Sequence, residues 1–149
     1  MKIKYILFLL FSMNVSAEFL ETKWTVTDHV GDLWYAKKEN LIGKNQIFDG
    51  GYAEGVFYSC DFAGQSMTYN TYKFKDILKN KELSQKGNLE KVLDKNYLNS
   101  EGQVFFVHRI TCNGKSISDR KVMYPFITAK NSNKGFYLYE GAIITLEYN

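Results

Sequence analysis

The chain has 149 residues, of which 45% are hydrophobic and 16% aromatic, and its formal net charge is +3. This length and composition are typical of one domain with its own hydrophobic core, and they exclude an intrinsically disordered chain. A content of 11 glycines and one proline also excludes a collagen-like protein or a flexible linker.

Residues 1–17 have the three parts of a secretory signal peptide. Residues 1–4 include two lysines, residues 5–11 form a short apolar run, and residues 15–17 end in the small pair Ser16 and Ala17. We expect cleavage after Ala17, which leaves residues 18–149 as one mature domain. Because lysine far outnumbers arginine, as in AT-rich bacterial genomes, we expect a bacterial periplasmic or secreted protein.

The charge and the apolar stretches of the mature chain argue against binding to nucleic acid and against insertion into a membrane. Without two of the 19 basic residues, and with all 16 acidic residues, its net charge is +1. No run of lysine or arginine is dense enough to follow a phosphate backbone, so we expect no nucleic acid. No second apolar stretch is long enough for a transmembrane helix, so we expect no membrane insertion of the mature chain.

Two short strands, 23–27 and 33–36, are expected at the start of the mature chain because both contain tryptophan beside other strand-forming residues. Val30-Gly31-Asp32 separates them as a turn. A polar stretch follows, and Gly50-Gly51-Tyr52-Ala53-Glu54-Gly55 then marks a bend rather than a phosphate-binding loop, since no lysine and helix follow it.

A hairpin of strands 52–62 and 66–74 is expected around Ala63-Gly64. A two-residue turn sets Cys60 opposite Met67, Tyr58 opposite Tyr69 and Val56 opposite Thr71. The same register places Tyr58, Cys60 and Tyr69 on the face that we expect to be the core side.

The period of the sequence then changes, which predicts two helices near 75–83 and 88–98. Leu89, Val92, Leu93 and Tyr97 follow the spacing of one helical face, and Asn88 is a candidate N-cap. The charged residues of this insertion are expected on the solvent-exposed face.

Residues 103–112 predict a strand whose even positions, Val104, Phe106, Ile110 and Cys112, form an apolar face. Asn113-Gly114 predicts a two-residue hairpin turn. This turn sets Cys112 opposite Lys115 and His108 opposite Asp119.

Two last strands are expected at 121–129 and 136–148, joined by the polar turn 130–135. Pro125 cannot donate a ladder hydrogen bond, so it indicates a sheet edge or a bulge. Together these elements predict an α+β fold, with a mainly antiparallel sheet or small barrel of about six to eight strands and a helical insertion near 75–98.

Cys60 and Cys112 predict a structural disulfide, because an even pair of cysteines in an exported chain is most simply oxidised. Closing a loop of this size contributes about 4 kcal/mol in the chain-entropy estimate. The alternative is a redox or nucleophilic cysteine. It is disfavoured because the chain has no Cys-x-x-Cys motif and no cationic neighbour of either thiol.

Neither histidine predicts catalysis or metal binding. His29 lies in an expected turn and has no second ligand at metal spacing, so we expect it at the surface. His108 opposite Asp119 has the composition of a general base with its orienting carboxylate, but a cross-strand polar pair is the better explanation, because no nucleophilic serine accompanies it. We therefore expect no enzymatic activity, no metal and no cofactor.

The aromatic side chains are the candidate binding residues, because tyrosine and tryptophan combine apolar area with a polar tip. Alternatively, they fill a small core. The candidates are Trp24, Trp34, Tyr35, Tyr52, Tyr72, Tyr137 and Tyr139.

These features predict an exported, non-enzymatic binding protein that engages a protein partner, of an inhibitor or immunity type. One alternative is a carrier that holds a small ligand in an aromatic-lined barrel mouth. Another is a subunit of an exported toxin or surface assembly. The identity of the partner does not follow from the sequence.

Overall fold

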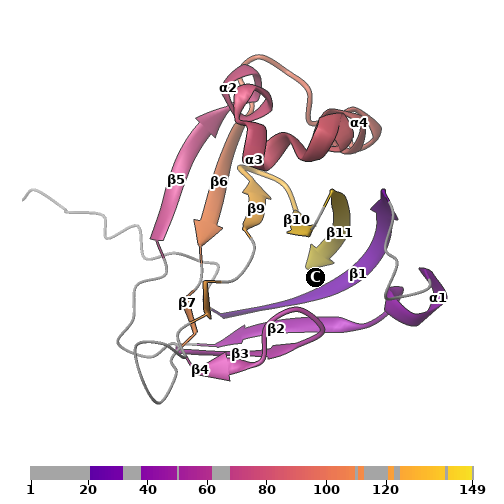
Figure 1. Ribbon diagram of the computed structural model, residues 1–149, viewed down its shortest axis with the longest axis vertical. Helices are drawn as coiled ribbons and strands as arrows, with labels where there is room; N and C mark the ends of the chain where they lie inside the picture. Colours follow the sequence, from indigo (N-terminus) through magenta and orange to yellow (C-terminus); the bar gives the residue numbers. More distant parts are fainter. Residues whose placement is uncertain are drawn as a thin grey trace, which may run out of the picture.

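The computed structural model describes residues 21–31, 38–49, 51–61, 68–109, 111–112, 121–122, 125–139 and 141–148. Nine of the strands in this part form one sheet in the order β4-β3-β2-β1-β11-β10-β9-β6-β5, and β7 pairs with β8 in a small ribbon. Every described pair is antiparallel. The expected α+β fold with an antiparallel sheet and a helical insertion is confirmed (Figure 1).

The strands are β1 (Glu21–Val30), β2 (Asn45–Asp49), β3 (Tyr52–Gly55), β4 (Cys60–Asp61), β5 (Thr68–Lys73), β6 (Val104–Arg109), β7 (Thr111–Cys112), β8 (Lys121–Val122), β9 (Phe126–Ala129), β10 (Lys134–Tyr139) and β11 (Ala142–Tyr148). The helices are α1 (Lys38–Leu41), α2 (Phe74–Lys79), α3 (Lys81–Ser84), the 3-10 turn η2 (Gln85–Gly87) and α4 (Asn88–Lys95).

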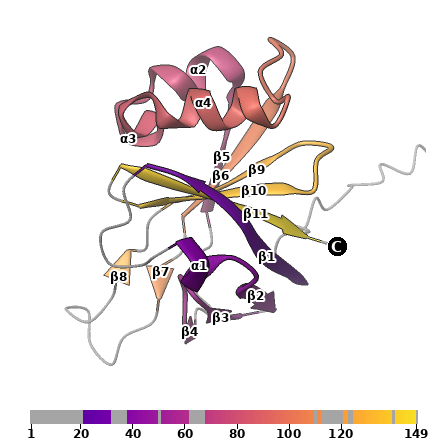
Figure 2. The same ribbon diagram turned by 90° about the vertical axis from the view of Figure 1, so that its right-hand side faces the viewer.

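The long strand β1 turns the corner of the sheet. Its register against β11 shifts between Val26 and Asp28, which leaves Thr27 as an extra residue in a β-bulge. A bulge bends its strand and increases the local twist. In consequence the sheet curls into a half-barrel, with β2, β3 and β4 on one side of the bend and β9, β10 and β11 on the other (Figure 2).

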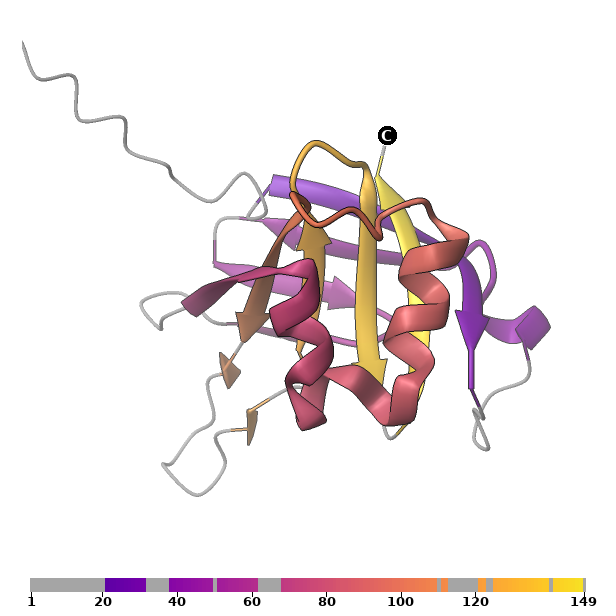
Figure 3. The same ribbon diagram turned by 90° about the horizontal axis from the view of Figure 1, so that it is seen from above.

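The sheet separates two hydrophobic cores. We call the one inside the curl the inner cluster; it contains Trp24, Val26, Leu41, Phe48, Ala53, Tyr58, Phe126, Tyr137, Ile144 and Leu146. We call the one under the helices the outer cluster; it contains Ile77, Leu83, Leu89, Val92, Leu93, Leu98, Phe105, Val107, Ile127, Ala129, Phe136, Leu138 and Ile143. Figure 3 shows the helices lying over the strands that contribute to the outer cluster. Neighbours such as Phe136 and Tyr137 therefore enter opposite cores.

The helical insertion is confirmed, but its helices are shorter than expected. Asn80 divides the first one, because its side chain accepts hydrogen bonds from the backbone N–H groups of Glu82 and Leu83 and so caps α3. Asn88 is not the N-cap of α4, which is Gly87. The Asn88 amide instead donates to the carbonyl of Gly141 at 2.6 Å.

The end of α4 also differs from the expectation. The predicted helical face included Tyr97, but Tyr97 has a φ of +58° and its side chain is 92% exposed. Its backbone has already left the helix, since the helix ends at Lys95. Leu98 takes the buried position on the outer cluster.

The hairpin expected between 52–62 and 66–74 is wrong. β3 pairs instead with β4, with Ala53 opposite Cys60, and β5 pairs with β6, with Tyr69 opposite His108. The reason is a break in the first strand after Gly55, which has a φ of +148°. A Cβ there would lie 2.4 Å from the carbonyl oxygen of Asn45, so the chain turns where only glycine fits.

The hairpin expected at Asn113-Gly114 is also wrong, because Cys112 pairs with Lys121 rather than with Lys115. The predicted pairing of His108 with Asp119 fails for a physical reason. Both edges of β6 at His108 are already occupied, by Tyr69 of β5 and by Phe126 of β9. A local turn signal cannot compete with two strand partners along the same residues.

The predicted apolar face of this strand is wrong as well. The side chains buried in the outer cluster are Phe105 and Val107, whereas Val104 and Phe106 are only half-buried. Both sets contain apolar residues, so the alternation in the sequence did not decide between the two faces.

Each of the two last predicted strands is divided in two. Residues 121–129 contain β8 and β9 with Pro125 directly before β9, as expected for a residue without a ladder donor. Residues 136–148 belong to β10 and β11, a hairpin in which Tyr139 faces Ala142. The polar turn before them is shorter than expected, because β10 already begins at Lys134.

Several predictions lie outside the described residues and stay predictions. They concern the signal peptide at 1–17 and the strand at 33–36 with Trp34 and Tyr35.

Candidate interaction site

Three of the five aromatic candidates that the structure describes lie in the inner cluster or pack against it. The ring centroid of Trp24 lies 5.2 Å from that of Phe126, and Tyr137 stacks on Phe57 at 4.2 Å. Trp24 is 2% and Tyr137 is 3% exposed, so the core-filling alternative holds for both. Tyr139 is partly buried against the same cluster.

The other two described candidates lie elsewhere. Tyr72 of β5 is partly buried against the outer cluster. Tyr52 of β3 is 43% exposed and lies opposite Asp49 in the ladder. The charge of Asp49 and a hydrogen bond to it raise the pKa of the Tyr52 hydroxyl above its ordinary value. Tyr52 is the one described candidate with a large exposed side chain.

A buried glutamine fixes the loop that closes the inner cluster. Gln46 has no exposed surface, and its Oε1 accepts hydrogen bonds from the backbone N–H groups of Phe57 at 3.0 Å and Tyr58 at 2.9 Å. Its Nε2 donates to the carbonyls of Glu54 and Tyr58. One side chain thus substitutes for the ladder bonds that the chain loses between β3 and β4.

β5 is the longer of the two edges of the main sheet. It has six residues, whereas β4 at the other edge has two. Within the described part of the chain, β5 pairs with β6 and with no other strand. An edge of this kind presents a row of backbone N–H and C=O groups to one side.

The side chains of β5 alternate between the two faces of the sheet. Tyr72 points toward the helices, and Tyr69 lies on the opposite face, which continues the inner face of the curl. Tyr69 contacts Phe106 edge-on, with ring centroids 5.8 Å apart, and lies 5.9 Å from the ring of His108. It is 41% exposed. The expectation that Tyr69 belongs to the core is therefore wrong; it is an anchored but accessible ring.

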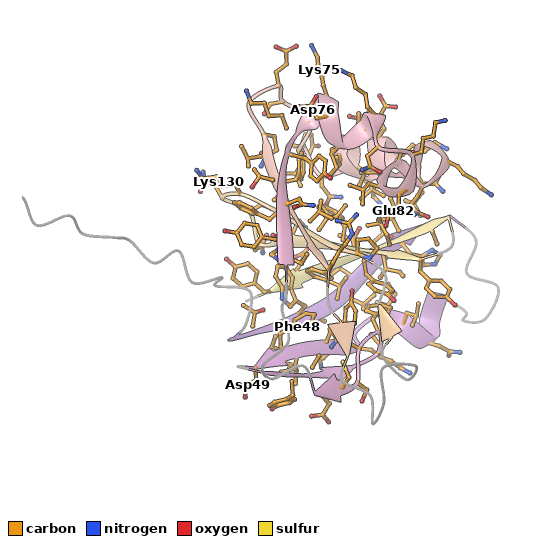
Figure 4. All side chains as sticks on the ribbon, turned by 60° about the vertical axis from the view of Figure 1, so that its left-hand side comes forward. Phe48, Asp49, Lys75, Asp76, Glu82 and Lys130 are labelled. Carbon is orange, nitrogen blue, oxygen red and sulfur yellow. The ribbon has the colours of Figure 1, made fainter. Side chains whose placement is uncertain are left out.

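Two lysines lie near the C-terminal end of β5, Lys73 in the strand itself and Lys130 beyond the neighbouring strand β6. Lys73 pairs with Val104 across the ladder, and the backbone N–H of Lys130 donates to the carbonyl of the same Val104 at 2.9 Å. Both lysines are exposed, and neither has an acidic partner among the residues that the structure describes. In Figure 4 the Lys130 side chain points outward, well away from Phe48 and Asp49 at the other end of the molecule.

His108 lies directly beneath this surface. It is 4% exposed, and its Nε2 forms a hydrogen bond of 3.0 Å with Oγ1 of Thr128. Burial lowers the pKa of His108 from 6.5 to about 4, because desolvation disfavours the charged ring. The folded protein thus holds a neutral imidazole at pH 7.

This shift predicts a pH-dependent stability. The unfolded chain binds the proton with the ordinary pKa, so stability is highest above pH 6.5 and falls as the pH drops from 6.5 toward 4. Between pH 7 and pH 5 the loss due to His108 is expected to be about 2 kcal/mol. Urea unfolding at both pH values measures it. A His108→Gln variant should lose this part of the pH dependence, and an identical pH dependence in both proteins would contradict the assignment.

The prediction that His29 is a surface residue in a turn is wrong. It lies within β1 opposite Ile144, and both ring nitrogens are buried without a hydrogen-bond partner in the described part of the chain. Among the described residues no group of three or more histidine, cysteine, aspartate or glutamate side chains could hold a metal ion. No helix found there is long and apolar enough to span a membrane.

Comparisons with known proteins give no information on the function of this site. No family model, curated protein or solved structure matches the chain. The candidate site is therefore defined by its own residues alone, and we refer to it as the β5 edge: the backbone of Thr68–Lys73 together with Tyr69, Lys73 and Lys130.

The sequence predictions missed most of the β5 edge. No prediction singled out Lys73 or Lys130, and Tyr69 was assigned to a core face through an incorrect hairpin. One signal was available. The segment 68–73 carries polar and aromatic residues on both of its faces, which is typical of a strand that the core covers only in part.

Proposed function

We propose that this chain is an exported, non-enzymatic binding protein that engages a protein partner through the β5 edge. The observation that carries this proposal is an exposed six-residue strand at the end of a nine-stranded sheet. Adding a strand to such an edge is a common mode of peptide recognition, since the backbone groups provide affinity and the neighbouring side chains provide specificity.

The anchoring of Tyr69 supports the same proposal. Phe106 and His108 hold its ring from one side, while 41% of the residue stays exposed. A tyrosine that is already held in place loses little conformational entropy when a partner covers it. Such residues are typical of the centre of a protein interface.

The carrier alternative is less well supported. It requires an open mouth lined by aromatic side chains, but Trp24 and Tyr137 are buried in contacts with other rings. The alternative of an assembly subunit predicts a stable oligomer of this chain, which light scattering of the purified protein would detect.

The compartment and the disulfide belong to the proposal. Export is supported by the signal-like segment 1–17. Pairing of Cys60 with Cys112 is supported by the absence of a free thiol in the described part of the chain, and by the position of β7 on the same side of the molecule as β4 (Figures 1 and 2). We expect thiol-reactive reagents to label neither cysteine in unfolded, non-reduced protein and both after reduction. Labelling of both before reduction would refute the pairing.

Site-specific cross-linking tests the binding function. A photoreactive phenylalanine is placed at position 69 and the protein is irradiated in its host's periplasm. We expect a covalent adduct with one polypeptide, which mass spectrometry identifies. The same adduct should form when the purified partner is mixed with the protein. The matched control places the same group at Tyr97, which is 92% exposed after α4. No adduct at position 69, or the same adducts at both positions, would contradict the proposal.

A small molecule that co-purifies with the protein at equal stoichiometry would instead favour the carrier alternative.

A further inference from the structure

We infer that the β5 edge takes an extended acidic segment of the partner as an added strand, with an apolar side chain over Tyr69 and a carboxylate opposite Lys73, in the positive potential of Lys73 and Lys130. This inference rests on the proposed function and specifies the chemistry of its partner. It follows from the backbone, the side-chain spacing and the charge of the edge.

The backbone of β5 is suited to accept a further strand. Its six residues pair in unbroken register with β6, from Thr68 opposite Arg109 to Lys73 opposite Val104. It contains no proline or glycine, the residues that commonly interrupt an edge. The groups on its outer side therefore form a regular template for main-chain hydrogen bonds.

The side chains on one face set the spacing of the ligand. Tyr69, Thr71 and Lys73 share the face away from the helices, because side chains alternate along a strand. Tyr69 and Lys73 are four residues apart, which corresponds to about 13 Å along an extended chain. Thr71 between them is small and exposed. A matching segment has an apolar residue and an acidic residue four positions apart.

The charge of the edge selects an acidic ligand. The nearby acids are already paired with other bases: Glu101 with Lys75, Asp76 with Lys79 at 4.0 Å, and Glu82 with Arg109 at 3.0 Å. Lys73 and Lys130 remain without such a partner in the described part of the chain. Their Cα atoms flank Val104, at about two strand spacings or 10 Å from each other. A carboxylate on the added strand opposite Lys73 lies closest to Lys73, and Lys130 adds positive potential from further inside the sheet.

The opposite edge of the sheet has the opposite character. β4 offers only two residues, and the neighbouring strands β2 and β3 present the exposed acids Asp49 and Glu54. An acidic segment is repelled there. The charge distribution thus directs such a ligand to β5 rather than to β4.

The test compares three synthetic nine-residue peptides on the full mature chain. The first alternates valine and threonine and has one phenylalanine and one glutamate four residues apart. The second has lysine in place of glutamate, and the third has two central prolines that prevent strand pairing. We expect fluorescence anisotropy to give the glutamate peptide an affinity at least fivefold above that of the lysine peptide, and no binding of the proline peptide. Hydrogen exchange should slow for the amides of 68–73.

Charge reversal on the protein provides the matched control. The double variant Lys73→Glu with Lys130→Glu should reverse the order of the two peptides. Lys86→Glu with Lys91→Glu makes the same change of charge on the exposed side of the helices and should leave that order unchanged. All four positions are exposed, so both variants are expected to fold.

Three results would overturn the inference. They are equal affinity for both peptides, binding without slower exchange in β5, and protection of β5 by self-association of the protein alone. If cross-linking at position 69 still captures one partner, the binding function stands and only the acidic, strand-adding mode fails. If the capture fails too, both are wrong.

Discussion

Replacement of Gln46 by leucine is expected to lower the free energy of unfolding by about 4 kcal/mol. Leucine fills a similar volume but leaves the backbone N–H groups of Phe57 and Tyr58 without their acceptor, and the carbonyls of Glu54 and Tyr58 without a donor. An unsatisfied buried polar group costs about 1–3 kcal/mol. Urea unfolding of the purified variant measures the loss.

The matched control is Gln103→Leu. Gln103 also donates to two backbone carbonyls, of Val104 and Lys130, but it is only half-buried at the surface. Water can replace its hydrogen bonds, so we expect a loss of at most about 1 kcal/mol. Equal losses in the two variants would show that Gln46 does not anchor the loop in the way described.

Substitution of Gly135 by alanine is expected to cost about 3 kcal/mol, in spite of adding a single methyl group. The new Cβ would lie 2.6 Å from Cζ of Phe126 and 2.8 Å from Cζ3 of Trp24. Both rings are buried and packed edge to face with each other, so neither can withdraw without disturbing the inner cluster. Thermal and urea unfolding should both report the loss.

Gly102→Ala is the control for this substitution. A Cβ at Gly102 meets nothing within 4 Å, and the backbone there is accessible to any residue. Alanine should be neutral or stabilise the protein by up to about 1 kcal/mol, through a smaller entropy of the unfolded chain. If alanine at position 135 were also neutral or stabilising, this would contradict the close approach of the Phe126 and Trp24 rings to Gly135.

The helical insertion could be predicted from the sequence because its signals are local. Leu89, Val92 and Leu93 repeat with the period of a helix, and all three are buried in the outer cluster. The end of α4 could not be placed as well, since Tyr97 and Leu98 are both apolar. Only the backbone turn at Tyr97 decides which of them reaches the core.

Both hairpin registers predicted from turn signals were wrong, because such signals describe only a few adjacent residues. The signal at Asn113-Gly114 concerns two residues, whereas the ladders of β6 with β5 and β9 involve long-range contacts that no short window contains. The predicted partner of His108 was wrong for this reason. The α+β class was nevertheless correct, because alternating strands and a change of period suffice to indicate it.

The candidate site depends on information that the sequence does not carry directly. Whether Tyr69 lies in a core or at an edge is decided by the strand order, which places β5 last in the sheet. Gln46 was missed because no strand was predicted over 45–49, and a polar residue in an alternating strand normally indicates the solvent side in any case. Its burial becomes understandable only when the loop at Phe57 and Tyr58 folds back over it.

The strands β9, β10 and β11 separate two hydrophobic regions with a single layer of backbone. Phe126 and Ile127, Phe136 and Tyr137, and Ile143 and Ile144 each send consecutive side chains into different regions. A displacement of this layer that relieves one region compresses the other, so neither half can melt while its neighbour stays intact. Calorimetry of this molecule should accordingly record one heat-absorption peak, with equal calorimetric and van't Hoff enthalpies.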